Sequence, residues 1–156
     1  MIAKWYIIHF MHKDFYASGF IFHLPTQQIL LQQPKKVASG SPNWSLFGTK
    51  SKPKEDEKVA FQRAINKTLK LKLSLKSIEP IYSYFNKEIE KENLLLYAPL
   101  AKMKNFRPKN GTTFGWFTFK QVLKLQMDEQ TKHDIVVGQR VVASKARKLS
   151  GQQTLE

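Results

Sequence analysis

The segment 55–71, EDEKVAFQRAINKTLKL, constrains the fold more than any other part of the sequence. Its apolar residues Phe61, Ile65 and Leu69 recur every four positions, which is the spacing of one face of an α-helix. Pro53 and a run of acids stand at the start, where they suit the positive end of the helix dipole, and lysines follow at the other end. We therefore expect an amphipathic helix whose apolar face needs another layer of structure to cover it.

Strand patterns flank this helix on both sides. Phe15–His23 and Gln28–Gln33 are separated by a polar turn that contains Pro25, which predicts a β-hairpin. The remaining expected elements are strands at Ile78–Phe85, Asn93–Leu100 and Thr112–Phe119, a short helix at Phe119–Leu125 and a longer one at Gln130–Leu149. This order favours an α/β fold, a mixed sheet covered by helices, within one domain that spans residues 1–156.

Composition supports a packed core in a reducing compartment. The chain is 42% hydrophobic and 12% aromatic, and it has no cysteine for a disulfide, a thiolate zinc site or a nucleophile. The apolar run Trp5–Met11 is too short for a bilayer, which needs about 20 residues, and it lacks a signal-cleavage site. We read residues 1–13 as a lead-in, residues 150–156 as a flexible tail, and the protein as cytoplasmic, with no membrane partner.

The formal net charge of +14 is the most unusual global property. A charge of this size favours polyanionic partners such as nucleotides or RNA, and it also keeps a protein soluble without any such partner. Both interpretations stay open at the level of composition, and a homodimer stays compatible with the sequence.

Several segments resemble the Nudix hydrolase family, whose fold is an α/β/α sandwich around a mixed sheet. SGFIFHLPTQQILLQQ (18–33) resembles the opening hairpin of that family, and NWSLFG (43–48) resembles the approach to its glycine-rich turn. GWFTFKQVLKL (115–125) is similar to the late strand and the short helix that follows it. The resemblance implies a nucleoside-diphosphate-linked substrate and magnesium-dependent hydrolysis.

The family motif, G-x5-E-x7-R-E-U-x-E-E-x-G-U with U a bulky aliphatic residue, matches this chain in part. Placing Arg63 on the motif arginine puts Glu55 on the first glutamate, because seven residues separate them. Ile65 and Leu71 then take the aliphatic positions, and Thr49 takes the first glycine, with Gly48 just before it. The resemblance therefore makes Glu55 the retained acid of the motif and Arg63 its structural partner.

The positions that carry the family's chemistry differ. Ala64, Lys67 and Thr68 stand where the motif has glutamates, and Lys70 stands at the late glycine. Magnesium requires hard oxygen ligands, which alanine and lysine lack. Two like charges about 4 Å apart repel by about 4 kcal/mol at an effective dielectric constant near 20, so the ammonium of Lys67 disfavours a cation there. We expect a degenerate Nudix box with no metal and no cofactor.

The same region offers cationic and aromatic side chains for a ligand. We expect the lysines to replace the charge of a metal and to bind a diphosphate without cleaving it, because lysine acts as a point-charge phosphate binder. The candidate ligand-binding residues are Lys50, Lys52, Lys54, Lys67, Lys70, Trp44 and His133. Asp128 and Glu129, before the last helix, fall where some relatives carry a catalytic acid.

Three functions stay open. The first is a Nudix-like module that binds a nucleotide, a nucleoside-diphosphate derivative or RNA without hydrolysis. The second is a divergent pyrophosphohydrolase that binds Mg²⁺ through Glu55 and acids outside the motif. The third is a protein-interaction domain that retains only the fold.

Overall fold

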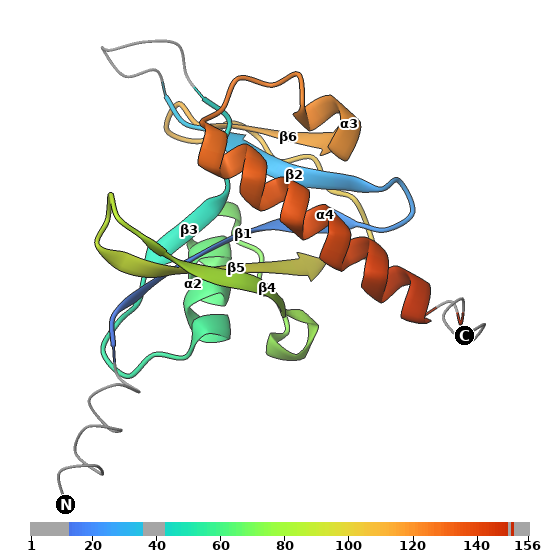
Figure 1. Ribbon diagram of the computed structural model, residues 1–156. Coiled ribbons are helices and arrows are strands. Elements are labelled where there is room, and N and C mark those ends of the chain that lie inside the picture. Colours follow the sequence, from blue (N-terminus) through green and yellow to red (C-terminus); the bar gives the residue numbers. More distant parts are fainter. Residues whose placement is uncertain (1–12, 36–42, 150, 152–156) are drawn as a thin grey trace, which may run out of the picture. The chain divides into compact units, whose positions relative to one another are not determined.

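The computed structural model describes residues 13–35, 43–149 and 151 of the chain (Figure 1). The elements are β1 (Phe15–His23), β2 (Gln28–Gln33), β3 (Phe47–Lys50), α2 (Glu57–Leu69), the 3₁₀ turn η1 (Leu75–Ser77), β4 (Glu79–Asn86), β5 (Lys91–Pro99), β6 (Thr113–Thr118), α3 (Phe119–Val122) and α4 (Glu129–Leu149). The predicted lead-in at Trp5–Met11 lies outside the described residues, as does the predicted tail apart from Gly151. In the part of the chain that is described, no helix is both long and apolar enough to cross a bilayer.

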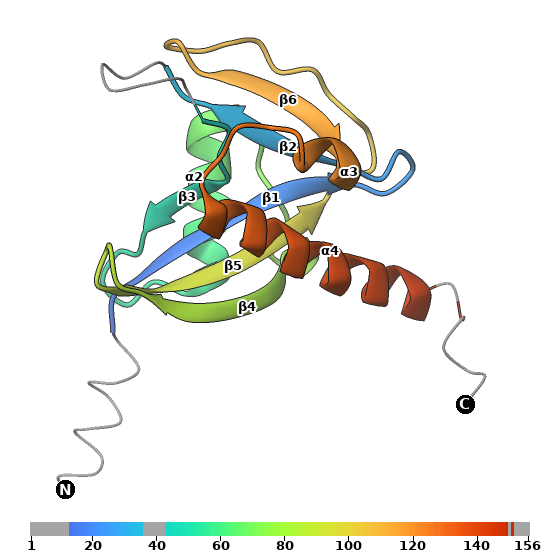
Figure 2. The same ribbon diagram turned by 45° about the horizontal axis from the view of Figure 1, so that its top comes forward.

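The strands form a six-stranded sheet with the order β4-β5-β1-β2-β6, and β3 pairs with β1 outside this path. The β1–β2, β1–β3 and β2–β6 pairs are antiparallel. Figures 1 and 2 show β1 and β5 running in the same direction, so the sheet is mixed, as the sequence predicts.

The chain divides into two compact units. The first consists of Met1–Gly19 and Phe47–Leu96, and the second of Phe20–Leu46 and Tyr97–Glu156. The division passes through β1 and β5, each of which contributes residues to both units. A single domain over residues 1–156 stays a prediction.

The first unit is built around α2. The buried face of this helix comprises Ala60, Phe61, Ala64, Ile65 and Leu69, which includes the four-residue stripe predicted from the sequence. The helix packs on β3, and β3 pairs with β1 in the register Tyr16↔Lys50 to Gly19↔Phe47. Burying a side chain such as Phe61 or Ile65 contributes about 1.5–3 kcal/mol, so this face is what holds the helix in place.

The second unit contains the predicted hairpin and the closing helices. β2 pairs with β6 over its whole length, from Gln28↔Thr118 to Gln33↔Thr113 (Figure 2). The Thr118 hydroxyl accepts a hydrogen bond from the backbone N–H of Gln121, whose side chain accepts one from the backbone N–H of Thr118. This reciprocal capping box explains why a helix begins directly after the strand.

Three expectations from the sequence need correction. β3 was not predicted as a strand, because its four residues, FGTK, follow an irregular loop and carry no alternation. The central helix begins at Glu57 rather than at Glu55, since Asp56 is its N-cap and accepts a hydrogen bond from the backbone N–H of Lys58. The helical spacing of Ile135, Val142 and Leu149 predicts one apolar face for the last helix, but Leu149 is 87% exposed.

Candidate functional site

Glu55 and Arg63, the two polar residues that the sequence aligns with the motif, form one bidentate ion pair in the first unit. Arg63 donates from Nε to Glu55 Oε2 at 2.9 Å and from Nη2 to Glu55 Oε1 at 2.8 Å. Only 8% of the Glu55 side chain is exposed, compared with 28% of the Arg63 side chain. Such two-point pairing is among the stronger polar interactions in proteins.

The same pair fixes the loop between β3 and α2. Arg63 Nη2 also donates to the backbone carbonyl of Lys50 at 2.8 Å. Arg63 Nη1 donates a longer hydrogen bond, 3.4 Å, to the hydroxyl oxygen of Thr49. Glu55 Oε1 accepts from the backbone N–H of Lys52 at 3.0 Å. The spacing of Glu55 and Arg63 therefore holds the end of a strand against the first turns of a helix.

Hydrogen bonding determines the charge state of the pair. The hydrogen bond from Arg63 holds the pKa of Glu55 below its ordinary value, against a smaller opposing effect of burial. The hydrogen bond to Glu55 raises the pKa of Arg63. Both groups are charged at neutral pH, and the Glu55 carboxylate oxygens are already occupied by Arg63 and the loop, so Glu55 is positioned as a structural acid.

The three positions that hold glutamates in the motif lie on the same helix. Ala64 is buried, Lys67 is exposed and Thr68 is half-buried. A methyl group, an ammonium and a hydroxyl do not fit magnesium, which prefers several oxygen ligands including carboxylates. Among the described residues, no three His, Cys, Asp or Glu side chains gather closely enough to hold a metal ion.

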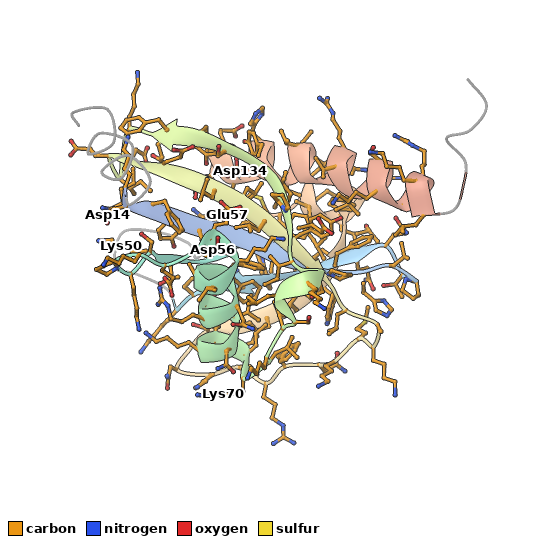
Figure 3. All side chains as sticks on the ribbon, turned by 90° about the horizontal axis from the view of Figure 1, so that it is seen from below. Asp14, Lys50, Asp56, Glu57, Lys70 and Asp134 are labelled. Carbon is orange, nitrogen blue, oxygen red and sulfur yellow. The ribbon has the colours of Figure 1, made fainter. Side chains whose placement is uncertain are left out.

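The candidate lysines are divided between the two ends of α2. Before the helix, Lys50 ends β3, Lys52 and Lys54 lie on the loop that follows, and all three are exposed. Lys67 lies in the last turn of α2 and Lys70 is its C-cap. Thirteen helical residues span about 20 Å. Figure 3 shows Lys50, Asp56 and Glu57 around the first turn and Lys70 at the opposite end. The structure therefore brings Lys67 close to Lys70 but separates both from the loop lysines.

Lys70 also explains the late glycine of the motif. Its backbone adopts the left-handed conformation, with φ 55° and ψ 34°, and its N–H donates to the carbonyl of Asn66. Glycine is the usual residue in this conformation, because any Cβ is strained there. The helix therefore ends in a conformation that glycine would favour, although lysine occupies the position.

Trp44 and His133, the other two candidates, belong to the second unit. Trp44 packs edge-on against Phe117 with 4.7 Å between ring centroids, and its backbone N–H donates to the carbonyl of Gln126. Trp44 as a whole is half-buried, and its role in ligand binding stays a prediction. His133 is exposed in the first turns of α4.

Asp128 acts at the start of α4. Its carboxylate accepts a hydrogen bond from the backbone N–H of Thr131 at 2.7 Å, and its carbonyl accepts one from Lys132. This is the geometry of a helix N-cap, a role that needs no catalytic function. Glu129, next to it, is the first residue of the helix and is exposed.

A small pocket of about 180 Å³ lies beside the first turn of α2 and was not expected from the sequence. It is lined by Glu57, Pro80, Tyr82, Ser83 and Leu94–Leu96. No local sequence pattern indicates that β4, β5 and α2 meet there, because their residues are far apart in the chain. The pocket is smaller than the roughly 300–1,000 Å³ of typical ligand sites.

Comparison by sequence finds no match to this chain, either among protein-family profiles or, at a significant level, among curated proteins. Comparison by structure finds many similar proteins. A mutT/nudix family protein from Listeria innocua has a TM-score of 0.61 and 16% identity, over 87% of this chain and 96% of that one. The Ap4A hydrolase of C. elegans, in a binary complex, has a TM-score of 0.62 and 14% identity, over 83% of this chain and 98% of the hydrolase.

A third similar structure is not described as a hydrolase. The C-terminal domain of mouse MUTYH, solved in complex with human PCNA, has a TM-score of 0.64 and 10% identity, over 84% of this chain and 90% of that one. At these identities the likeness extends to the arrangement of the backbone and not to the residues of a site. The α/β fold class predicted from the sequence is confirmed, and the chain has the Nudix fold.

Proposed function

We propose that this chain is a Nudix-fold module that binds a nucleotide or a nucleoside-diphosphate derivative without the magnesium-dependent hydrolysis of the family. The observation that carries the proposal is a contrast between residues of α2 and the loop before it. Arg63 and Glu55 retain the ion pair that shapes the motif, whereas Ala64, Lys67 and Thr68 replace its carboxylates. The ion pair is thus present, whereas other residue types stand where the family motif has metal-binding carboxylates.

Lys67 is the residue that we assign to the phosphates. It is exposed and occupies the position of a metal-binding glutamate of the motif, so its ammonium supplies positive charge where the family uses a cation. Lys70 lies in the next turn of the chain and adds a second charge. An ammonium binds phosphate as a point charge and without a metal.

The pocket beside Glu57 is left out of this assignment. Glu57 lies ten residues before Lys67, which is about 15 Å along the helix. The pocket volume of about 180 Å³ is also below that of a site for a whole nucleotide.

The test is a binding experiment with a charge-matched control. Calorimetric titration of nucleoside mono-, di- and triphosphates and dinucleoside polyphosphates is expected to give binding that EDTA does not abolish. Lys67→Glu is expected to weaken that binding by about tenfold, which corresponds to 1.4 kcal/mol. Lys72→Glu makes the same charge change at an exposed position outside the motif, so it is expected to change affinity by much less.

Two results would contradict the proposal. Release of phosphate or pyrophosphate that requires Mg²⁺ would favour the divergent hydrolase instead. Absence of binding to every nucleotide in the series would favour a domain that retained the fold for protein interaction.

A further inference from the structure

The second unit contains a basic loop, residues 101–112, that no part of the proposed function uses. Between Glu92 and Asp128 the sequence has six basic residues and no acidic residue. Four of these cations, Lys102, Lys104, Arg107 and Lys109, belong to the loop, and all four are exposed. No carboxylate within the described part of the chain lies within ion-pair distance of any of them. The loop therefore carries concentrated charge that the rest of the fold does not neutralise.

The loop is held in one conformation along β6. Trp116 Nε1 donates to the carbonyl of Lys104 at 2.8 Å, and the Phe106 and Phe114 rings meet edge to face at 6.3 Å. Figure 2 shows the loop running beside the strand that follows it. Because β6 is the last strand of the sheet, the loop lies at the edge of the sheet rather than over its face.

The tip of the loop is a tight turn. The backbones of Lys109 and Thr112 exchange two hydrogen bonds, at 3.0 and 2.9 Å, and Asn110 and Gly111 between them both have positive φ, 52° and 82°. This is the two-residue type I′ turn that Asn-Gly favours. The side-chain stem of Lys35 lies against Gly111, so a fifth cation joins the tip.

Aromatic side chains interleave with these charges. Phe106, Phe114 and Trp116 are each half-buried, which leaves part of each ring open to solvent. Lys102 and Lys104 are separated by one residue in the chain, as are Arg107 and Lys109 across Pro108. Regularly spaced cations beside partly exposed rings are what proteins use to hold a phosphodiester chain and stack its bases.

We propose that the basic loop is a binding surface for single-stranded nucleic acid. The cations contact the phosphates, and Phe106 with Trp116 contacts the bases. A lipid surface fits less well, because membrane-binding loops expose large apolar side chains, and no residue of 101–118 is among the strongly exposed hydrophobic residues of the described chain. The proposal shares no residue with the α2 site and does not rest on nucleotide binding there.

The test measures anisotropy of a fluorescent oligouridylate titrated with the full chain between about 50 and 200 mM salt. Four phosphate contacts predict a slope of log K against log salt of about −3. The triple variant Lys102→Gln, Lys104→Gln, Lys109→Gln is expected to lose about tenfold in affinity or more and to reduce the slope by about 2. The control with the same change in net charge, Lys72→Gln, Lys76→Gln, Lys87→Gln, places its substitutions on exposed residues of the first unit and is expected to retain most of the affinity.

A second variant tests stacking separately from charge. Phe106→Leu is expected to weaken binding about fivefold or more, and Phe106→Tyr is expected to restore it, because a base stacks on an aromatic ring and not on leucine. Lys67→Glu is expected to leave oligouridylate binding intact, so failure of this proposal and failure of nucleotide binding are distinguishable.

Four results would overturn the inference. The first is an equal loss of oligouridylate affinity in the two triple variants, and the second is a binding constant that does not depend on salt. The third is stronger binding to a duplex than to a single strand of the same length. The fourth is binding to phosphatidylserine vesicles that is as strong as binding to oligouridylate and that the loop triple variant abolishes.

Discussion

Arg63 and Glu55 lie eight positions apart in the sequence and meet in a two-point ion pair, with distances of 2.9 and 2.8 Å. The arginine is in the helix and the glutamate is before it, so the pair ties the β3–α2 loop to the second turn of α2. The interaction stabilises the conformation of the loop that leads from β3 into α2.

Removing the charge of Glu55 should destabilise the protein. Glu55→Gln keeps the size of the side chain but leaves Arg63 with a neutral partner in a largely buried position, so we expect a loss of about 2 kcal/mol in the free energy of unfolding. Urea denaturation at neutral pH measures this loss. Glu88→Gln, in the exposed β4–β5 turn, is the control and should change stability by less than about 0.5 kcal/mol. A loss of equal size in both variants would show that the ion pair contributes no more to the free energy of unfolding than an exposed glutamate does.

The same pair predicts an acid-dependent stability. Because the pKa of Glu55 is lower in the folded state than its ordinary value of 4.5, its contribution is fully present above about pH 4.5 and is lost as the pH falls through the folded-state pKa. The difference in free energy of unfolding between wild type and Glu55→Gln should therefore be constant at neutral pH and shrink in acid. A difference that stays constant down to pH values well below the ordinary pKa would contradict this assignment.

Lys70 should be replaceable by glycine with a gain in stability. Its left-handed backbone costs about 1 kcal/mol for a residue with a Cβ, so Lys70→Gly is expected to raise the free energy of unfolding by up to about 1 kcal/mol. Lys67→Gly removes the same charge from within the helix and is expected to lower it by about 1 kcal/mol. Thermal or urea unfolding of both variants should give changes of opposite sign. Changes of the same sign would indicate that charge, rather than backbone conformation, dominates at this end of α2.

Restoring carboxylates should restore affinity for magnesium. The double variant Lys67→Glu, Thr68→Glu places two acids on adjacent residues of the exposed and half-buried side of α2, and it removes the repelling ammonium. We expect it to bind Mg²⁺ at least about tenfold more tightly than the wild type in a calorimetric titration. Lys67→Gln, Thr68→Gln has the same size without the charge and should show no such gain. Equal Mg²⁺ affinity in all three proteins would mean that the helix is not positioned as a metal site.

Gly19 should tolerate no side chain. A Cβ built there would lie 1.9 Å from the backbone oxygen of Leu96 and 2.9 Å from Cε1 of Phe61, so the strand and the helix would both have to move. Gly19→Ala is expected to destabilise the protein by about 3 kcal/mol, seen as a lower urea midpoint. Gly151→Ala, where a Cβ would meet nothing within 4 Å, is the control and should cost about 1 kcal/mol or less. A near-neutral Gly19→Ala would mean that β1 and β5 are not packed this closely.

Elements with a strong local pattern were predicted well from the sequence. The hairpin at Phe15–His23 and Gln28–Gln33 has the predicted bounds, and the last helix begins one residue earlier than predicted. The central helix is shorter at both ends, because Asp56 caps its start and Lys70 ends it in the left-handed conformation. Periodicity predicts which face of a segment is buried. The ends of a helix can be predicted only from the residue types that favour cap positions.

The spatial arrangement of the candidate residues could not be predicted from the sequence alone, because it depends on contacts between distant residues, and their roles stay predictions. The sequence predicted Glu55 and Arg63 as partners through the spacing of a known motif, and the structure shows the hydrogen bonds between them. The lysines were predicted as one group, but α2 separates Lys50 from Lys70 by its own length. No local sequence pattern predicts the pocket beside Glu57 or the course of the basic loop along β6.

By itself the sequence determined the amphipathic helix, the hairpin, the strongly positive charge and the absence of carboxylates at Ala64, Lys67 and Thr68. These follow from residue chemistry and from spacing within a few turns of chain. Only the tertiary structure decided that β3 is a strand, that Asp128 caps a helix, and that Trp116 anchors a loop of unpaired cations. Each of these depends on a hydrogen bond between residues that only the packing of the chain brings together. The free energy that favours this packing is spread over many residues, so no single residue determines it.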